Sequence, residues 1–268
     1  MNGELSQIIE LVVVFNSGQF DDIYSIGNGG KYYNPLSFIV FKKKFLGGYK
    51  EVQIGSNSKD WFVQLKGNGC QRINLVYESD NSQAADHMLA GFVGGGGNWF
   101  LEAEYENHSD FWGAKWEVIP EKKRKNEIVW DITYALIGPE RSKFKHPTYN
   151  INTQKQALSS VLDRIAKLTD VKEYLSNWGE IFRVAKAMLE APISKENYLS
   201  YLEGYISNED CIKLLSARAK SSVFGGMGSW NDIGGFDKEE DNKLYDELSV
   251  KLYSELNRTF LTAVNFRG

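Results

Sequence analysis

Eight residues between two helical patterns read Gly225-Gly226-Met227-Gly228-Ser229-Trp230-Asn231-Asp232. Glycines concentrate where the backbone takes a positive φ or comes very close to another group. We therefore expect Gly225, Gly226 and Gly228 to form a structural loop that clamps the flanking helices together. The alternative is a ligand or partner site that uses the side chains of Ser229, Trp230, Asn231 and Asp232. A phosphate-binding loop is disfavoured, because no strand precedes the glycines and no lysine lies among them.

Helical periodicity surrounds this loop from about residue 150 onward. Apolar residues recur at spacings of three and four, and the last helix carries the stripe Leu244, Leu248, Leu252, Leu256 and Phe260. Asp170 and Asn208 are expected to cap helix starts, and Pro192 to end a helix. The predicted helices cover residues 154–168, 170–190, 194–206, 208–220 and 237–265.

The first half of the chain has mostly period-two patterning, punctuated by glycine. Short runs of β-branched and aromatic residues alternate with Gly/Asn/Ser/Asp clusters, which is typical of strands and turns. The predicted strands cover residues 37–41, 61–65, 73–77, 99–105 and 128–132, with a short helix over 80–89. The run Gly94–Gly97 is followed by a strand pattern, so it predicts a turn or bulge and not a nucleotide site.

The fold class predicted is therefore α+β, with a mostly antiparallel β N-terminal half followed by an α-helical bundle. The connecting stretch 138–147 contains two prolines, a glycine and several basic residues, which marks an exposed linker. We expect a β-rich domain over residues 1–146 and a helical domain over residues 147–268.

Composition narrows the classes of function. Of the 268 residues, 42% are hydrophobic, and the mean hydropathy is -0.39, as expected of a soluble globular protein. Residues 1–140 hold 13 Lys/Arg and 18 Asp/Glu, a net charge of −5, whereas residues 141–268 hold 18 and 17, a net charge of +1. Neither half has the basic footprint of a nucleic-acid-binding protein.

Localisation is predicted to be cytoplasmic. No stretch approaches the length of a membrane span, and the short run Leu11–Phe15 lacks the flanks of a signal peptide. Cys70 and Cys211 are the only cysteines, and two distant cysteines favour reduced thiols over a disulfide framework.

Three acidic residues, Glu102, Glu104 and Glu106, alternate along a predicted strand and so share one face of it. Paired carboxylates can hydrolyse glycosides, or they could bind a metal together with the neighbouring His108 and Asp110. The commoner interpretation is a solvated outer face. The sequence leaves both open.

Aromatic residues gather in the same region: Trp99, Tyr105, Phe111, Trp112, Trp116 and Trp130. Exposed rings, of which Trp99, Trp112 and Trp116 are the candidates, would suit a sugar or a protein partner, whereas buried rings would form the core. His87, His108 and His146 fit no metalloprotease or triad spacing. We therefore predict no catalytic residue, no metal and no cofactor.

The segment from Leu214 to Val264, with Val223-Phe224 before the glycine loop and a Leu/Tyr-rich helix after it, resembles a small helical domain of uncharacterised bacterial proteins. The motif of that domain reads Gly-Gly-Met-Gly-Ser-aromatic-Asn-Asp. The resemblance covers about a fifth of the chain, and this chain departs from the pattern at Ile233–Phe236. Some proteins of this kind look associated with bacterial toxin-immunity systems, so the resemblance implies a protein partner.

These observations predict a non-enzymatic bacterial protein-binding factor, of the immunity or antitoxin kind, that acts by occluding its partner. The alternative is a carbohydrate-active hydrolase or sugar-binding protein that uses Glu102, Glu104 and nearby tryptophans. A third interpretation is a structural subunit of an assembly.

Overall fold

The computed structural model describes residues 3–19, 32–44, 47–80, 84–125, 127–137, 141–142, 145–193, 202, 204–233 and 235–267. The chain divides into two compact units. The β-rich unit consists of Asn2–Val76 and Trp99–Pro147, and the helical unit of Tyr77–Asn98 and Thr148–Gly268. The predicted division at residue 146 lies next to the change at Pro147, but the sequence does not reveal that Tyr77–Asn98 joins the helices.

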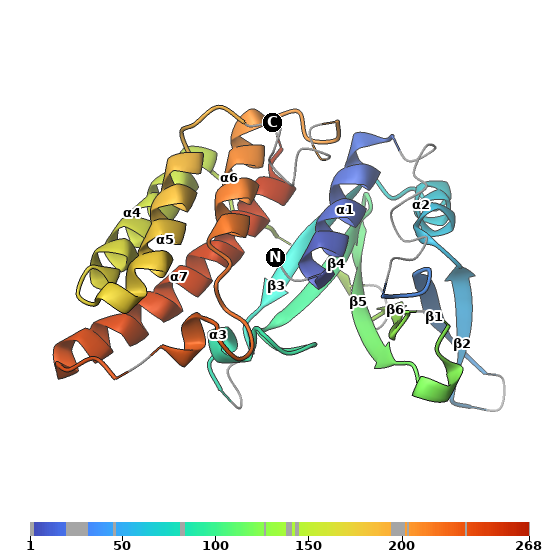
Figure 1. The fold of residues 1–268 in the computed structure, drawn as a ribbon. Coiled ribbons are helices and arrows are strands. Elements are labelled where there is room, and N and C mark those ends of the chain that lie inside the picture. Colours follow the sequence, from blue (N-terminus) through green and yellow to red (C-terminus); the bar gives the residue numbers. More distant parts are fainter. Residues whose placement is uncertain are drawn as a thin grey trace. The chain divides into compact units, whose positions relative to one another are not determined.

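The β-rich unit is built on one mixed sheet, so the α+β class is confirmed while the sheet is not purely antiparallel (Figure 1). The strand order is β2-β1-β6-β5-β4-β3, and β7 pairs with β5. β1 runs parallel to β6, whereas β1–β2, β4–β5, β5–β6 and β5–β7 are antiparallel. The strands are β1 (Ser37–Lys43), β2 (Tyr49–Gly55), β3 (Arg72–Glu78), β4 (Asn98–Glu104), β5 (His108–Val118), β6 (Trp130–Leu136) and β7 (Arg141–Ser142).

Two helices complete this unit. In α1 (Gly3–Ser17) the apolar residues from Ile8 to Phe15 are buried, and Gln7 accepts a hydrogen bond of 3.0 Å from the Tyr134 hydroxyl of β6. The apolar N-terminal run is therefore a core helix. No helix among the described residues is long and apolar enough to cross a membrane.

The second helix, α2 (Ser58–Gly67), replaces the strand predicted at 61–65, which is wrong. Asn57 caps it by accepting a hydrogen bond of 2.9 Å from the Asp60 amide. The residues it buries, Ser58, Trp61, Phe62 and Leu65, are spaced as one helical face. The Trp61 ring stacks on Phe38 of β1 at 4.3 Å between centroids, so this face joins the core of the sheet.

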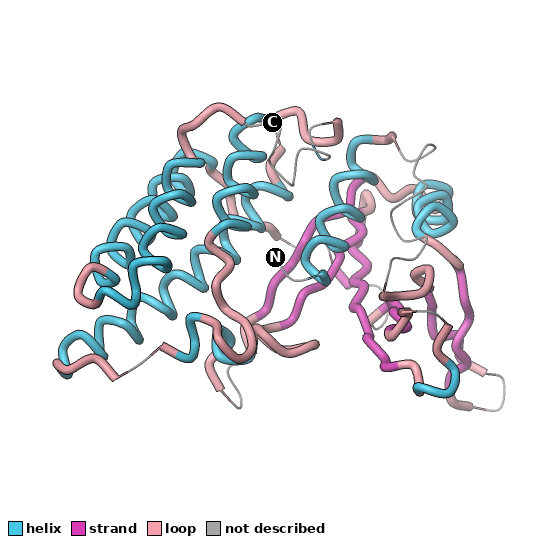
Figure 2. Tube along the Cα trace, viewed as in Figure 1, coloured by secondary structure: helices cyan, strands magenta, loops and turns pink. Residues whose placement is uncertain are grey.

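The helical unit contains four long helices: α4 (Ile151–Thr169), α5 (Ser176–Met188), α6 (Glu209–Lys220) and α7 (Glu239–Asn265) (Figure 2). α4 packs on α5 and α7, and α6 packs on the same two helices. The expected stripe of α7 is buried from Leu248 through Phe260. The predicted bundle is therefore confirmed.

Two helix boundaries differ from the prediction. Asp170 ends α4 and does not begin α5, because the chain turns through the 3-10 segment Glu173–Leu175 before α5 starts at Ser176. Asn208 does cap α6, accepting from the amides of Asp210 and Cys211. Most of the helix expected over 194–206 lies outside the described residues.

The segment Tyr77–Asn98 supplies the last part of the helical unit. It contains the short helix α3 (Asp86–Leu89) and the glycine run 94–97, and it connects β3 to β4. α3 contacts α7.

Candidate functional site

The predicted acidic face of β4 is buried. Glu102 is 0% exposed and Glu104 is 5% exposed, whereas Glu106 lies beyond the strand end and is exposed. Leu101 and Ala103 alternate with these carboxylates and are buried too. Both faces of β4 are therefore covered at this point.

Partners from neighbouring segments hold the two carboxylates. Asn74 of β3 donates from Nδ2 to Glu102 Oε2 at 2.9 Å and to Glu104 Oε2 at 3.1 Å. Ser109 of β5 donates from Oγ to Glu102 Oε1 at 2.5 Å, and His146 Nε2 hydrogen-bonds to Glu102 Oε2. We call these five residues the Glu102 cluster. Both oxygens of Glu102 are occupied, so this carboxylate ties β3, β5 and the chain before α4 to β4.

His108 and Asp110 lie beside each other near the start of β5. His108 Nε2 and Asp110 Oδ1 are 4.0 Å apart, and the His108 ring stacks on Tyr105. Among the described residues, no group of three or more His, Cys, Asp or Glu side chains is placed to hold a metal ion. The metal site considered for these residues and the glutamates of β4 is therefore not formed.

The aromatic candidates divide between core and surface. Trp112 is buried and its ring meets those of Phe38 and Trp61, while Trp99 is partly exposed. Trp116 and Trp130 are also partly exposed and form an edge-to-face pair with 5.9 Å between centroids. The structure thus does not bring Trp99, Trp112 and Trp116 together as one exposed surface.

The loop Gly225–Asp232 is anchored by Trp230. Its side chain, a candidate contact residue from the sequence, is 0% exposed and packs on Trp178 and Phe182 of α5 and on Tyr245 of α7. Its Nε1 donates to Ser249 Oγ at 2.8 Å. This indole therefore links the loop to two helices and is closed to direct contact with a partner.

The remaining motif residues shape the turn. Ser229 Oγ donates to the Gly225 carbonyl at 3.1 Å and accepts from the Asn231 amide, while Asp232 accepts from the amide of Gly228, whose φ is +82°. Only glycine adopts that conformation without strain. Met227, at the tip of the turn, is 100% exposed.

The same loop braces the segment Tyr77–Asn98. Asn231 Nδ2 donates to the His87 carbonyl at 2.9 Å, and a Cβ placed on Gly91 would lie 2.3 Å from the carbonyl carbon of Gly225. The two backbones can cross this closely only because Gly91 has no side chain. The motif therefore fixes the position of α3.

A cavity of about 300 Å³ lies between α3 and α7. Its polar lining includes Tyr77, Asp86, His87, Tyr253 and Asn257. Asp86 is 5% exposed and accepts hydrogen bonds from the Tyr77 hydroxyl at 2.5 Å and from Ser79 Oγ at 2.7 Å. We call this feature the α3–α7 pocket.

The glycine run 94–97 positions two walls of this pocket. The Gly96 carbonyl accepts from the hydroxyl groups of Tyr253 at 2.6 Å and Tyr77 at 3.2 Å. Gly96 and Gly97 both have positive φ, and a Cβ on Gly97 would lie 2.5 Å from the Tyr77 ring. These glycines therefore serve a close approach of backbone to tyrosine.

Burial shifts the pKa values of two side chains that line the pocket. It raises the pKa of the Tyr77 phenol, and the hydrogen bond to Asp86 adds to this effect. It lowers the pKa of His87, although Asp246 and Asp86 act in the opposite direction. Burial therefore favours the neutral form of both side chains.

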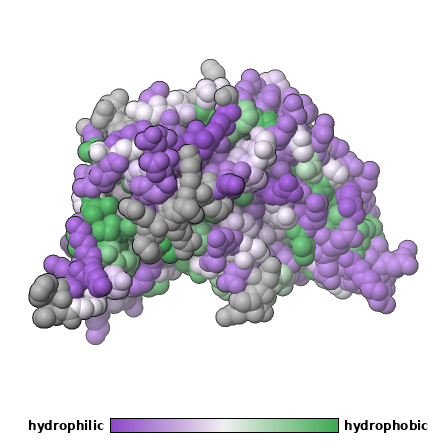
Figure 3. All heavy atoms as spheres, turned by 180° about the vertical axis from the view of Figure 1, so that it is seen from behind, coloured by the Kyte–Doolittle hydropathy of each residue, from purple (hydrophilic) through white to green (hydrophobic). Residues whose placement is uncertain are grey.

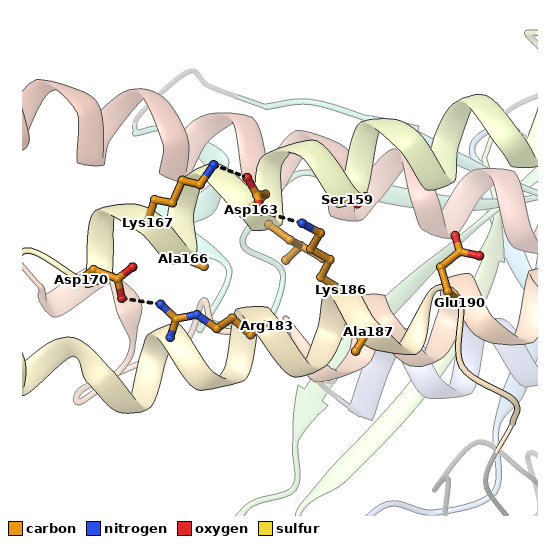
Figure 4. A pocket seen from close by; sticks show the side chains of 10 residues that line it. Ser159, Asp163, Ala166, Lys167, Asp170, Arg183, Lys186, Ala187 and Glu190 are labelled. Carbon is orange, nitrogen blue, oxygen red and sulfur yellow. Dashed lines mark hydrogen bonds and ion pairs between the residues drawn. The ribbon is translucent and has the colours of Figure 1, made fainter.

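A second hollow, of about 530 Å³, lies between α4 and α5 (Figure 4). Asp163 forms ion pairs with Lys167 at 2.8 Å and with Lys186 at 2.5 Å, and Arg183 pairs with Asp170. Because these charges neutralise one another, the hollow offers little to a charged ligand.

Exposed hydrophobic side chains are scattered. On the face seen in Figure 3, hydrophobic residues form separate areas among hydrophilic ones. Met227 is the most exposed of the large hydrophobic residues that the structure describes. The others with strongly exposed side chains are Tyr32, Phe41, Tyr49, Val63, Met88, Phe92, Val93, Val118, Val171, Tyr174 and Val250.

Both cysteine side chains are buried, which lowers the reactivity of their thiols. Burial raises the pKa of both Cys70 and Cys211 to about 12. The thiolate is the nucleophilic form, so both side chains are poor nucleophiles near neutral pH.

No family model, no curated protein and no solved structure matches the chain. The function is therefore argued from the residues of the chain itself.

The α3–α7 pocket is not predictable from the sequence. Tyr77, Asp86 and Asn257 carry no local motif, and Tyr77 lies far from Asn257 along the chain. The glycine run 94–97 is the one available signal, but the sequence does not reveal that its partners are Tyr77 and Tyr253. The role of His146 beside Glu102 is equally invisible in the sequence.

Proposed function

We propose that this protein binds a protein partner through the tip of the loop Gly225–Asp232, as a bacterial immunity- or antitoxin-like factor of the cytoplasm. The observation that carries the proposal is Met227, a large apolar side chain that is 100% exposed at the tip of an anchored turn. Methionine is enriched in protein interfaces. An apolar tip on an ordered loop suits insertion into a pocket of a partner.

The anchoring supports this proposal. Trp230 is held by three aromatic rings and by Ser249, and Asp232 accepts from the Gly228 amide. A loop that is already ordered loses less conformational entropy on binding, which favours affinity. The resemblance of this motif to domains associated with toxin-immunity systems points to the same class of partner.

The hydrolase alternative has weaker support. Glycoside hydrolysis needs two carboxyl groups that flank a substrate. Glu102 is 0% exposed, and both of its oxygens accept hydrogen bonds from the protein. The carboxylates of β4 are therefore better explained as structural acceptors.

Site-specific photocrosslinking tests the proposal. A photoreactive amino acid replaces Met227 in one variant and Val171, a half-exposed control in the same unit, in another. We expect a discrete protein adduct in cells of the source organism from position 227 and none from position 171. The adduct partner should be toxic when expressed alone and neutralised by the parent protein.

Met227→Asp should abolish that neutralisation, because it places a charge in an apolar contact, whereas Val171→Asp should retain it. If no adduct forms at position 227, or if Met227→Asp still neutralises the partner, the proposal is wrong.

A further inference from the structure

One group of exposed hydrophobic side chains lies together in the helical unit, although such side chains are otherwise scattered. Phe92 and Val93, which are both more than half exposed, directly follow Gly91. The backbone of Gly91 crosses that of Gly225, and Met227 lies two residues beyond this crossing. Figure 1 shows the motif loop passing beside α3. The exposed apolar side chains of two distant segments therefore project from neighbouring stretches of backbone.

Further contacts fix this arrangement. Asn231 donates to the carbonyl of His87, so the next residue, the exposed Met88, is also held beside the motif. The His87 ring packs edge to face on Phe224, which directly precedes the motif, with 5.7 Å between centroids. We call Met88, Phe92, Val93 and Met227 the apolar patch. Because both segments are anchored, the patch loses little conformational entropy when a partner covers it.

Two exposed carboxylates flank the apolar patch, and neither makes an ion pair among the described residues. Asp232 accepts a hydrogen bond from the backbone amide that follows Met227. Burial lowers the pKa of His87, and the carboxylate of Asp246 on α7 opposes this effect, so it lies near the α3 side of the patch. Burial raises the pKa of Tyr245 to about 12, and both carboxylates raise it further, so both lie near that hydroxyl.

These carboxylates indicate the kind of occupant. A second copy of this chain would meet the patch with the same patch, so like charges would face each other and repel. Lysine and arginine side chains of a different protein would instead pair with the carboxylates.

We propose that Met227 is one part of a composite docking surface, made of the apolar patch together with Asp232 and Asp246. Its occupant is a protein with an apolar pocket that is bordered by lysine and arginine side chains. This inference rests on the proposed function, a protein partner at Met227, and adds to it a second contact segment and the charge of the partner.

Photocrosslinking separates this inference from the proposed function. The photoreactive amino acid replaces Val93, and the Met227 and Val171 variants described above serve for comparison. We expect position 93 to give the same protein adduct as position 227, identified by mass spectrometry, and position 171 to give none. Without an adduct at position 227, the proposed function is wrong and this inference with it. If position 227 gives its adduct and position 93 does not give the same one, or captures a second copy of this chain, this inference alone is wrong.

Titration calorimetry with the purified adduct partner tests its charge. Asp246→Lys should weaken binding at least about tenfold, because it places a lysine against a basic surface. Glu247→Lys is the matched control, since it changes the net charge equally on the same helix, but Glu247 pairs with Arg164 of α4. It should keep the parent affinity. Binding of the parent protein should weaken between about 0.1 M and about 1 M NaCl, because salt screens exposed charges. Equal affinities of the two variants, or an affinity of the parent that does not fall with salt, would overturn the inference.

Phe92→Ser tests the apolar part of the surface. It should weaken binding at least about tenfold, because aromatic side chains at the centre of an interface carry much of its binding energy. Tyr174→Ser is the matched control in the same unit, since Tyr174 is 60% exposed and Phe92 is 64% exposed. Both variants should keep the parent Tm, and only Phe92→Ser should lose affinity. The inference is wrong if the two variants bind the partner equally well.

Discussion

Each unit of this protein buries a group of polar side chains, and the two groups differ in how completely they are paired. In the Glu102 cluster, both oxygens of the central carboxylate accept hydrogen bonds from Asn74, Ser109 and His146. In the α3–α7 pocket, Asp86 is similarly held, but neither side-chain polar atom of Asn257 makes a hydrogen bond of standard geometry among the described residues. The two groups therefore show that similar burial of polar side chains can go with different degrees of hydrogen bonding.

Local geometry explains the difference. Most residues of the Glu102 cluster lie on adjacent strands. The register of these strands determines which side chains are neighbours, and it places Glu104 opposite Ser109 in the β4–β5 pair. The α3–α7 pocket lies between a connecting segment and a helix, so its polar groups are not aligned by hydrogen bonds between paired strands.

The largest expected effect is that of Glu102→Leu. The substitution removes the carboxylate that Ser109 and His146 contact and one of the two acceptors of Asn74, and we expect the free energy of unfolding to fall by about 3 kcal/mol. Urea denaturation measures this loss. Glu106→Leu, on the exposed residue beyond the strand, should change stability by less than about 0.5 kcal/mol. Equal effects of the two substitutions would break the comparison, because the cluster would then not be structural.

Gly91→Ala should have the next largest effect. A Cβ at Gly91 would lie 2.3 Å from the Gly225 backbone, so the crossing must open, and we expect a loss of about 2 kcal/mol in the free energy of unfolding. Gly226→Ala is the control, since nothing lies within 4 Å of a Cβ there and its φ is not positive. The glycine that this crossing requires is thus Gly91, and within the motif neither Gly225 nor Gly226 is crowded. A larger fall in Tm for Gly226→Ala than for Gly91→Ala in thermal unfolding would contradict this assignment.

The sequence predicts the helical unit well, because long amphipathic patterns such as that of α7 are set by one helix face. It fails at 61–65, where Trp61, Phe62 and Leu65 resemble a strand run although Asn57 caps a helix. It also misses β5, although Gly113, Lys115 and Glu117 alternate there with apolar residues, as the period of a strand requires.

The candidate site is less accessible to sequence reasoning than the fold. The glycines reveal the motif loop, but the burial of Trp230 and the exposure of Met227 depend on packing against α5 and α7. Asn257 occupies an ordinary position on an amphipathic helix, and only the tertiary structure shows how its amide is buried.

The smallest expected effect is that of Asp163→Asn, on the partly exposed ion pairs between α4 and α5. Hydrogen bonds from Lys167 and Lys186 lower the pKa of Asp163 from 3.8 to about 2. Since the folded pKa lies below the unfolded one, the stabilisation is present above about pH 4 and is lost as the pH falls toward about 2. Solvent and salt screen such pairs, so their contribution to the free energy of unfolding should be small.

Urea denaturation at neutral pH should show a slightly less stable Asp163→Asn variant, and the difference from the parent should vanish at about pH 2. A difference at neutral pH as large as that of Glu102→Leu would mean that exposed ion pairs stabilise this fold as much as buried, fully paired carboxylates do.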